Sequence, residues 1–172
     1  MKKPGIIILL IISSLGLFSQ IKTSLVNGYA YERESTPGII PKTIGEDGKE
    51  STREIPRIKS YQLFLEYKKG TTIKPYKIWI NGIAYKVKTE NVTSTPLLFK
   101  TSNGTDNYET DTLVKKTRNS VMQLWIDGEI KPPPKVRLEI GKDKISVEYY
   151  YKGKSYLYTF QEPKKIAPQI LQ

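Results

Sequence analysis

From residue 60 onward, apolar and polar residues alternate with a period of two, and tight-turn residues interrupt the alternation about every ten residues. Successive side chains of a β-strand point to opposite faces of a sheet, so this pattern predicts strands with one buried face. No stretch has the spacing of an amphipathic helix longer than a turn or two. The chain is therefore expected to fold as an antiparallel β-sandwich of eight or nine short strands, immunoglobulin-like in general architecture.

The stretch YKIWINGIAYKV, residues 76–87, predicts a β-hairpin. Asn81-Gly82 favours a two-residue turn between two apolar-rich arms. The expected pairs on the apolar face are Ile80 with Ile83, Ile78 with Tyr85 and Tyr76 with Val87. The other face sets Lys77 opposite Lys86 and places Trp79 beside them. Like charges directly opposite each other destabilise a sheet, so local folding does not explain the two lysines.

Residues 135–160, KVRLEIGKDKISVEYYYKGKSYLYTF, predict three antiparallel strands. A turn at Lys152-Gly153 pairs the second strand with the third, and a turn around Lys142-Asp143 pairs the first strand with the second. The expected pairs are Val136 with Tyr149, Leu138 with Val147, Ile140 with Ile145, Arg137 with Glu148, Val147 with Tyr158, Tyr149 with Tyr156 and Ile145 with Phe160. Both turns place the same residues inward, and a one-residue slip would invert every side chain.

Residues 1–19 have the pattern of a secretory signal peptide. Lys2 and Lys3 give a positive start, an uncharged and mostly apolar run follows, and small residues offer cleavage sites after Gly16 or Ser19. A permanent anchor is the alternative, but a membrane span needs about 20 apolar residues. This run is shorter and contains serines and glycines. Export is therefore expected, with no membrane span in the mature chain.

Three further segments are expected after the signal peptide. Residues 20–58 mix Gly, Pro, Ser, Thr and charges without a sustained period, which predicts an extended or partly disordered lead-in. Within it, TPGIIP (36–41) has the composition of a short edge segment. Residues 59–161 form the β-sandwich domain. Residues 162–172 form a tail containing Ile166, Ile170 and Leu171, which is expected to cover an edge of its own sheet rather than a partner's.

The chain contains no histidine and no cysteine. Nucleophilic triads that depend on histidine are therefore excluded, as are zinc sites of the usual ligand sets and cysteine-ligated iron–sulfur clusters. The acids Glu109, Asp111, Asp127 and Glu129 remain for carboxylate chemistry. Polar loops carry acids routinely, so no enzymatic activity, cofactor or metal site is expected. An exported protein without disulfides also favours a bacterial source.

The formal net charge is +11, and nearly all of the basic excess follows residue 58. Such a field favours anionic partners, although lysines also solubilise sheets and oppose edge aggregation. Lys77, Trp79, Lys86 and Lys88 are the candidate ligand-binding residues, because they would combine positive charge with an aromatic surface. An acid from a neighbouring strand, such as Glu66, would neutralise the lysines instead.

These observations predict a non-enzymatic protein exported to the periplasm or outer envelope of a Gram-negative bacterium, with secretion as the alternative. The expected partner is another envelope protein or an anionic polymer or surface, and export argues against nucleic acid. One alternative is a carbohydrate-binding or carbohydrate-active module that uses Trp79, Trp125 or Tyr150 as a platform. A periplasmic enzyme inhibitor is the second alternative.

Overall fold

The computed structural model describes residues 24–37, 43–44, 50–51, 58–102, 108–136, 140–141 and 144–171, and within these residues it contains strands and no helix. The expected signal peptide, most of TPGIIP, and the predicted strand residues Arg137 and Leu138 lie outside the described residues. The strands are β1 (Leu25–Pro37), β2 (Thr43–Ile44), β3 (Glu50–Ser51), β4 (Ile58–Tyr67), β5 (Lys74–Ile80), β6 (Ile83–Val92), β7 (Leu97–Ser102), β8 (Tyr108–Val114), β9 (Ser120–Glu129), β10 (Ile145–Tyr151), β11 (Lys154–Thr159) and β12 (Lys164–Leu171).

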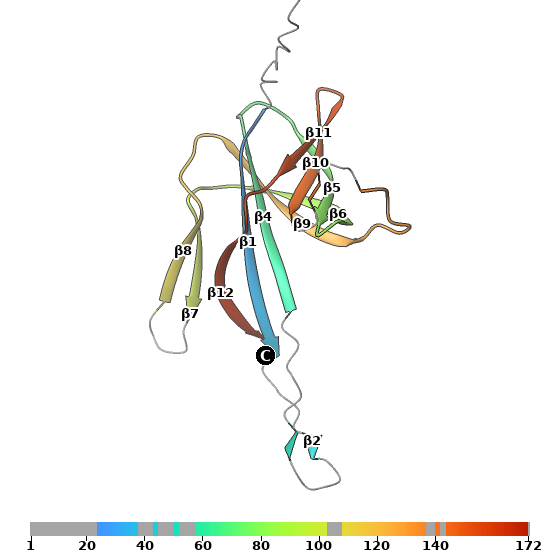
Figure 1. The fold of residues 1–172 in the computed structure, drawn as a ribbon. Coiled ribbons are helices and arrows are strands. Elements are labelled where there is room, and N and C mark those ends of the chain that lie inside the picture. The colour runs from blue at the N-terminus through green and yellow to red at the C-terminus, as the bar shows by residue number, and fades with distance from the viewer. Residues whose placement is uncertain are drawn as a thin grey trace, which may run out of the picture.

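One large sheet dominates the molecule (Figure 1). Its eight strands follow the order β11-β10-β5-β6-β9-β4-β1-β12, and β2-β3 and β7-β8 form separate two-stranded sheets. The prediction of an all-β, sandwich-like fold is confirmed. The large sheet is mixed rather than wholly antiparallel, because β12 runs parallel to β1.

The sheet curls, so that its distant strands β1 and β11 touch. A Cβ atom added at Gly28 on β1 would lie 2.9 Å from the hydroxyl oxygen of Tyr158 on β11. Only glycine allows the backbone and the ring to approach so closely. Because the sheet curls, it encloses the hydrophobic core from both sides. In a simple sandwich, two separate sheets do this.

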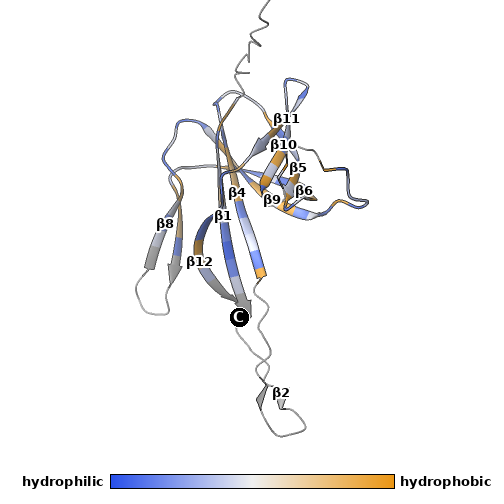
Figure 2. Ribbon diagram, viewed as in Figure 1, coloured by the Kyte–Doolittle hydropathy of each residue, from blue (hydrophilic) through white to orange (hydrophobic). Residues whose placement is uncertain are grey.

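The concave face of the sheet holds the main hydrophobic core. Residues from β4, β5, β9 and β10 meet there, including Leu65, Ile78, Leu124 and Val147, which are each at most 1% exposed. Figure 2 shows apolar residues on β9 and β10, where this core lies, whereas much of the second half of β1 is hydrophilic. The burial of β4 follows the same division, exposed at first and buried over its last five residues.

The β7–β8 hairpin covers part of the outer face of the sheet. Leu113 and Val114 of β8 pack with Phe64 of β4, Tyr31 of β1 and Ile166 of β12 in a second buried cluster. Tyr31 also donates a hydrogen bond to the Leu113 carbonyl oxygen. The hairpin is therefore fixed to the sheet by packing and by hydrogen bonding.

Both ends of the described chain join the large sheet. Residues Leu25–Pro37, which the sequence analysis placed in the lead-in, form β1 and pair with both β4 and β12. The sequence does not indicate this strand, because many of its residues are polar. Its outer face lies beside the β7–β8 hairpin and not in the main core. The tail forms β12 along β1, as expected of a segment that covers its own sheet edge.

The two turn predictions based on glycine are confirmed. Asn81 and Gly82 have φ angles of 51° and 80°, and Lys152 and Gly153 have φ angles of 48° and 74°. The left-handed conformation at both positions is typical of a type I′ hairpin turn. The expected registers on either side follow, with Ile78 opposite Tyr85 and Val147 opposite Tyr158.

The predicted pairing of residues 136–140 with β10 is wrong. The second neighbour of β10 is β5, which places Ile78 opposite Val147 and Lys77 opposite Glu148. Ile140 instead packs with Trp79 and Ala84. The buried strand β5, from earlier in the chain, thus occupies the position beside β10 that the turn around Lys142-Asp143 predicted for residues 136–140. The predicted pairs of Val136 with Tyr149 and Ile140 with Ile145 are therefore replaced by pairs with Pro75 and Ile80.

Candidate functional site

Two of the residues predicted from the sequence to bind a ligand, Lys77 and Trp79, belong to a cluster around Glu148. Trp79 is 1% exposed, and its indole N–H donates a 2.8 Å hydrogen bond to Glu148 Oε1. Tyr76 also donates its hydroxyl to Glu148, and Lys77 Nζ lies 3.6 Å from Glu148 Oε2. Lys77 further lies over the Trp79 ring, 5.3 Å from its centroid. The cluster stabilises the sheet, and the acid that pairs with Lys77 is Glu148 rather than the predicted Glu66.

Lys86 and Lys88 are exposed residues of β6. The β5–β6 ladder ends with Ile78 opposite Tyr85, so it does not include the predicted pair of Lys77 with Lys86. Lys88 forms an exposed ion pair with Asp127, with 2.7 Å between Nζ and Oδ1.

The two remaining aromatic candidates are exposed. Trp125 on β9 is 47% exposed, and Tyr150 on β10 is 45% exposed and stacks on Tyr76 with 4.5 Å between ring centroids. Of the candidate acids, Asp111 pairs with Lys164 and Asp127 pairs with Lys88. Across the described residues, no three potential metal ligands gather at one place.

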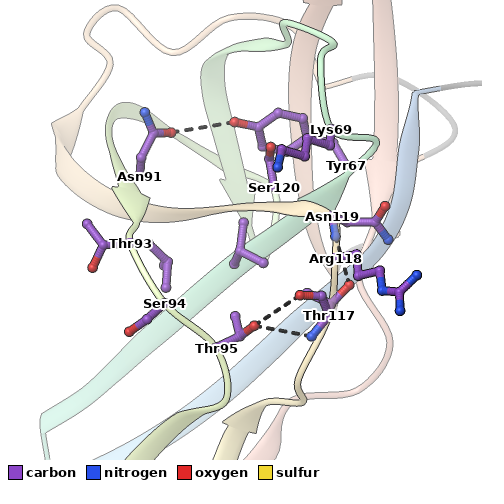
Figure 3. A pocket seen from close by; sticks show the side chains of 12 residues that line it. Tyr67, Lys69, Asn91, Thr93, Ser94, Thr95, Thr117, Arg118, Asn119 and Ser120 are labelled. Atoms are coloured by element: carbon purple, nitrogen blue, oxygen red, sulfur yellow. Dashed lines mark hydrogen bonds between the residues drawn. The ribbon is translucent and has the colours of Figure 1, made fainter.

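A polar pocket of about 780 Å³ lies at one end of the large sheet, where β4 and β6 end and β9 begins. Three connections surround it: the turn after β4, the segment between β6 and β7, and the segment between β8 and β9. In Figure 3, Thr93, Ser94 and Thr95 form one wall and Thr117 and Ser120 lie across from them, while the side chains of Arg118 and Asn119 extend away from that first wall. The lining residues are Tyr67, Lys69, Asn91, Val92, Thr93, Ser94, Thr95, Thr117, Arg118, Asn119, Ser120 and Val121.

The pocket combines positive charge with many hydrogen-bonding groups. Lys69 and Arg118 are its two ionised side chains, and none of the described lining residues is acidic. Neither cation takes part in the ion pairs found across the described residues. Hydroxyl and amide groups supply most of the remaining lining. Such a surface suits a ligand with a negative charge and several hydroxyl groups.

Hydrogen bonds hold the two walls of the pocket together. Thr117 N–H donates to Thr95 Oγ1 over 3.1 Å, and Thr95 donates back to the Thr117 carbonyl oxygen over 3.3 Å. Figure 3 draws both bonds, together with the 3.5 Å contact between the Tyr67 hydroxyl and Asn91 Oδ1. The walls are thus positioned before any ligand binds, which lowers the entropic cost of binding.

The buried carboxylate of Glu66 anchors this wall from behind. It accepts hydrogen bonds from Thr117 Oγ1 at 2.6 Å, Asn119 Nδ2 at 2.7 Å and the Tyr29 hydroxyl at 2.7 Å. Burial by itself raises the pKa of Glu66. The three hydrogen bonds together lower the pKa by more than burial raises it, so the pKa lies below its ordinary value of 4.5. Burial and the bond to Glu66 raise the pKa of Tyr29 to about 12. Glu66 therefore stays ionised at neutral pH, and Tyr29 stays protonated.

Sequence reasoning missed the pocket, because its residues come from three connections. One usable indication was the run KKTRN (115–119), which concentrates cations in a short link between two strands. Within the described part of the chain, no helix has the length and apolarity to span a membrane.

Comparisons with known proteins give no relative. No protein-family model matches the sequence, and no curated protein or solved structure is detectably similar to it.

Proposed function

We propose that the chain is a non-enzymatic binding protein of the bacterial envelope, and that its pocket holds an acidic sugar unit of an envelope polysaccharide or glycolipid. The observation that carries the proposal is the lining of the pocket, in which Lys69 and Arg118 accompany hydroxyl and amide groups and no acidic side chain. Lysine and arginine neutralise a carboxylate or phosphate, while the neutral groups bind sugar hydroxyls. The excess of basic residues after residue 58 attracts such polymers from a distance.

Calorimetric titration with three sugars tests the pocket. Glucuronate and glucose 6-phosphate represent a uronate and a phosphate source, and glucose is the uncharged control. We expect glucuronate or the phosphate to bind at least about tenfold more tightly than glucose, because each 1.4 kcal/mol of charge-assisted bonding contributes about that factor. Equal binding of all three sugars, or no binding of any, would overturn the proposal.

Paired lysine and arginine variants locate the binding. Lys69→Gln combined with Arg118→Gln removes both pocket cations, and we expect it to weaken acidic-sugar binding at least about tenfold. Lys131→Gln combined with Lys135→Gln removes the same charge from exposed positions beyond the other end of β9. If the two double variants weaken binding equally, attraction by the whole molecule accounts for the affinity and the pocket does not.

Export is part of the proposal, supported by the signal-peptide pattern of residues 1–19. We expect intact-mass spectrometry of the protein from an envelope fraction to find a chain that begins near Ile21 or a few residues earlier. A membrane-embedded chain that retains Met1 would overturn this part of the proposal.

A further inference from the structure

A second hollow adjoins the pocket. It has a volume of about 210 Å³ and shares four lining residues with the pocket, Asn91, Val92, Thr93 and Ser94. It then continues past Glu90, Gln123 and Leu97, between the outer face of β6 and β9 and the start of β7. A ligand that leaves the pocket over the end of β6 therefore enters a depression and not a flat surface.

The register of β6 and β9 continues this path to Trp125. Glu90 lies opposite Gln123 and Lys88 lies opposite Trp125, with no irregularity between the two pairs. Residues two apart on a strand share a face and are separated by about 7 Å. Trp125 is thus the next side chain beyond Gln123 on the face that carries the second hollow. Because Trp125 is 47% exposed, its indole ring is available to a ligand at this position.

The chemistry changes along the path. The pocket carries Lys69 and Arg118, whereas the second hollow carries the exposed acid Glu90. Glu90 would repel a second negative charge but accepts hydrogen bonds from sugar hydroxyls. Lys88 is already paired with Asp127, so it partly neutralises an acid beside Trp125 instead of presenting an unpaired charge. An indole face packs against the apolar C–H face of a sugar ring.

We infer that the ligand is a sugar chain in which an acidic unit occupies the pocket and an uncharged unit crosses the second hollow to pack on Trp125. This inference rests on the proposed function of the pocket, and it adds the length and the charge order of the ligand. Trp125 is the specificity-determining residue for chain length.

The test compares one sugar with a short chain on the full mature protein. The probes are glucuronate and a tetrasaccharide in which glucuronate alternates with N-acetylglucosamine. We expect the wild type to bind the tetrasaccharide at least about tenfold more tightly than glucuronate, which corresponds to about 1.4 kcal/mol. Acrylamide quenching of tryptophan fluorescence is expected to fall on addition of the tetrasaccharide but not of glucuronate, because only the chain reaches Trp125.

Variants of exposed apolar residues complete the test. We expect Trp125→Ala to remove most of the chain advantage and to change glucuronate binding by less than about twofold. Ile83→Ala, at a similarly exposed position at the start of β6, is the matched control and is expected to change neither affinity. An undiminished chain advantage in Trp125→Ala, or equal wild-type affinity for both probes, overturns this inference while leaving the pocket proposal intact. Failure of both probes to bind overturns the pocket proposal and this inference together.

Discussion

Glu66 and Glu148 are the two acids that the described fold buries, with exposed fractions of 6% and 2%. A carboxylate is tolerated inside a protein only when hydrogen bonds replace its hydration. Glu66 has three neutral donors, and Glu148 has the indole of Trp79, the hydroxyl of Tyr76 and the nearby Lys77. Each acid thus joins strands and connections that are distant in the sequence.

Glu148→Ala is expected to destabilise the protein by roughly 2–4 kcal/mol, because it leaves the buried Trp79 N–H without its acceptor and removes one of the two hydrogen-bond partners of the Tyr76 hydroxyl. The measurement is urea unfolding followed by tryptophan fluorescence. Glu162→Ala changes an exposed acid and is expected to cost less than about 0.5 kcal/mol. Equal costs from the two variants would show that Glu148 does not hold Trp79 and Tyr76 in solution.

Glu66→Gln is expected to show a pH-dependent effect on stability. The pKa of Glu66 in the folded protein is below its ordinary value of 4.5, so ionised Glu66 contributes stability above that value. This contribution is lost as the pH falls from about 5 through the folded pKa. The free-energy difference between wild type and Glu66→Gln should therefore be largest near pH 7 and shrink toward pH 3. Urea unfolding across that range gives the result, and a difference that grows toward low pH would contradict it.

At the scale of single elements, tight turns follow local chemistry. The Asn81-Gly82 turn requires positive φ at both residues, and the space around Gly82 is open, with nothing within 4 Å of an added Cβ. Backbone strain is thus the only cost of a side chain at Gly82. The turn is a property of the local sequence and needs no tertiary contact to explain it.

Gly82→Ala is expected to cost about 1–2 kcal/mol, the usual penalty for a side chain in the left-handed conformation. Asn81→Gly, at the preceding position of the same turn, is the control and is expected to change stability by no more than about 1 kcal/mol, since glycine adopts this φ without strain. Thermal and urea unfolding measure both variants. A Gly82→Ala protein as stable as wild type would show that the turn is not type I′ in solution.

Strand neighbours are less predictable than turns. The sequence placed a strand at 136–140 beside β10 on the basis of a nearby turn, but β5 occupies that position. Both arrangements bury Val147 on the same face, so the alternation along β10 cannot distinguish them. The buried residues of β5, such as Ile78, decide the competition, and only the folded chain brings them to β10.

At the scale of the whole molecule, the curl of the large sheet is the main structural feature. The contact between Gly28 and Tyr158 joins strands that are separated by five others in the sheet order. It also explains why β1 belongs to the fold, although its sequence shows no strong alternation. Closure therefore depends on a residue without a side chain in a segment that the sequence analysis left outside the domain.

Gly28→Ala is expected to destabilise the protein by roughly 1–3 kcal/mol, because the added methyl group collides with the Tyr158 ring. In a Tyr158→Ala background the collision is absent, so the same change is expected to cost at least about 1 kcal/mol less. Urea unfolding of the four proteins completes the double-mutant cycle. If Gly28→Ala costs the same in both backgrounds, β1 and β11 do not make this contact in solution.

The sequence by itself determined the all-β fold, the two glycine turns and the registers beside them. These depend on alternation and on backbone φ, which are properties of short segments. Tertiary structure alone decided the curl, the position of β1, the β5–β10 neighbourhood and the pocket. The pocket combines Lys69, Thr95 and Arg118 from three connections, and no spacing in the sequence relates them. Trp79 and Trp125 show the same difference between sequence and structure. Each lies opposite the apolar stripe of its own strand, so the sequence does not distinguish them. In the structure, Ile140 packs against Trp79 and buries it, whereas Trp125 is exposed.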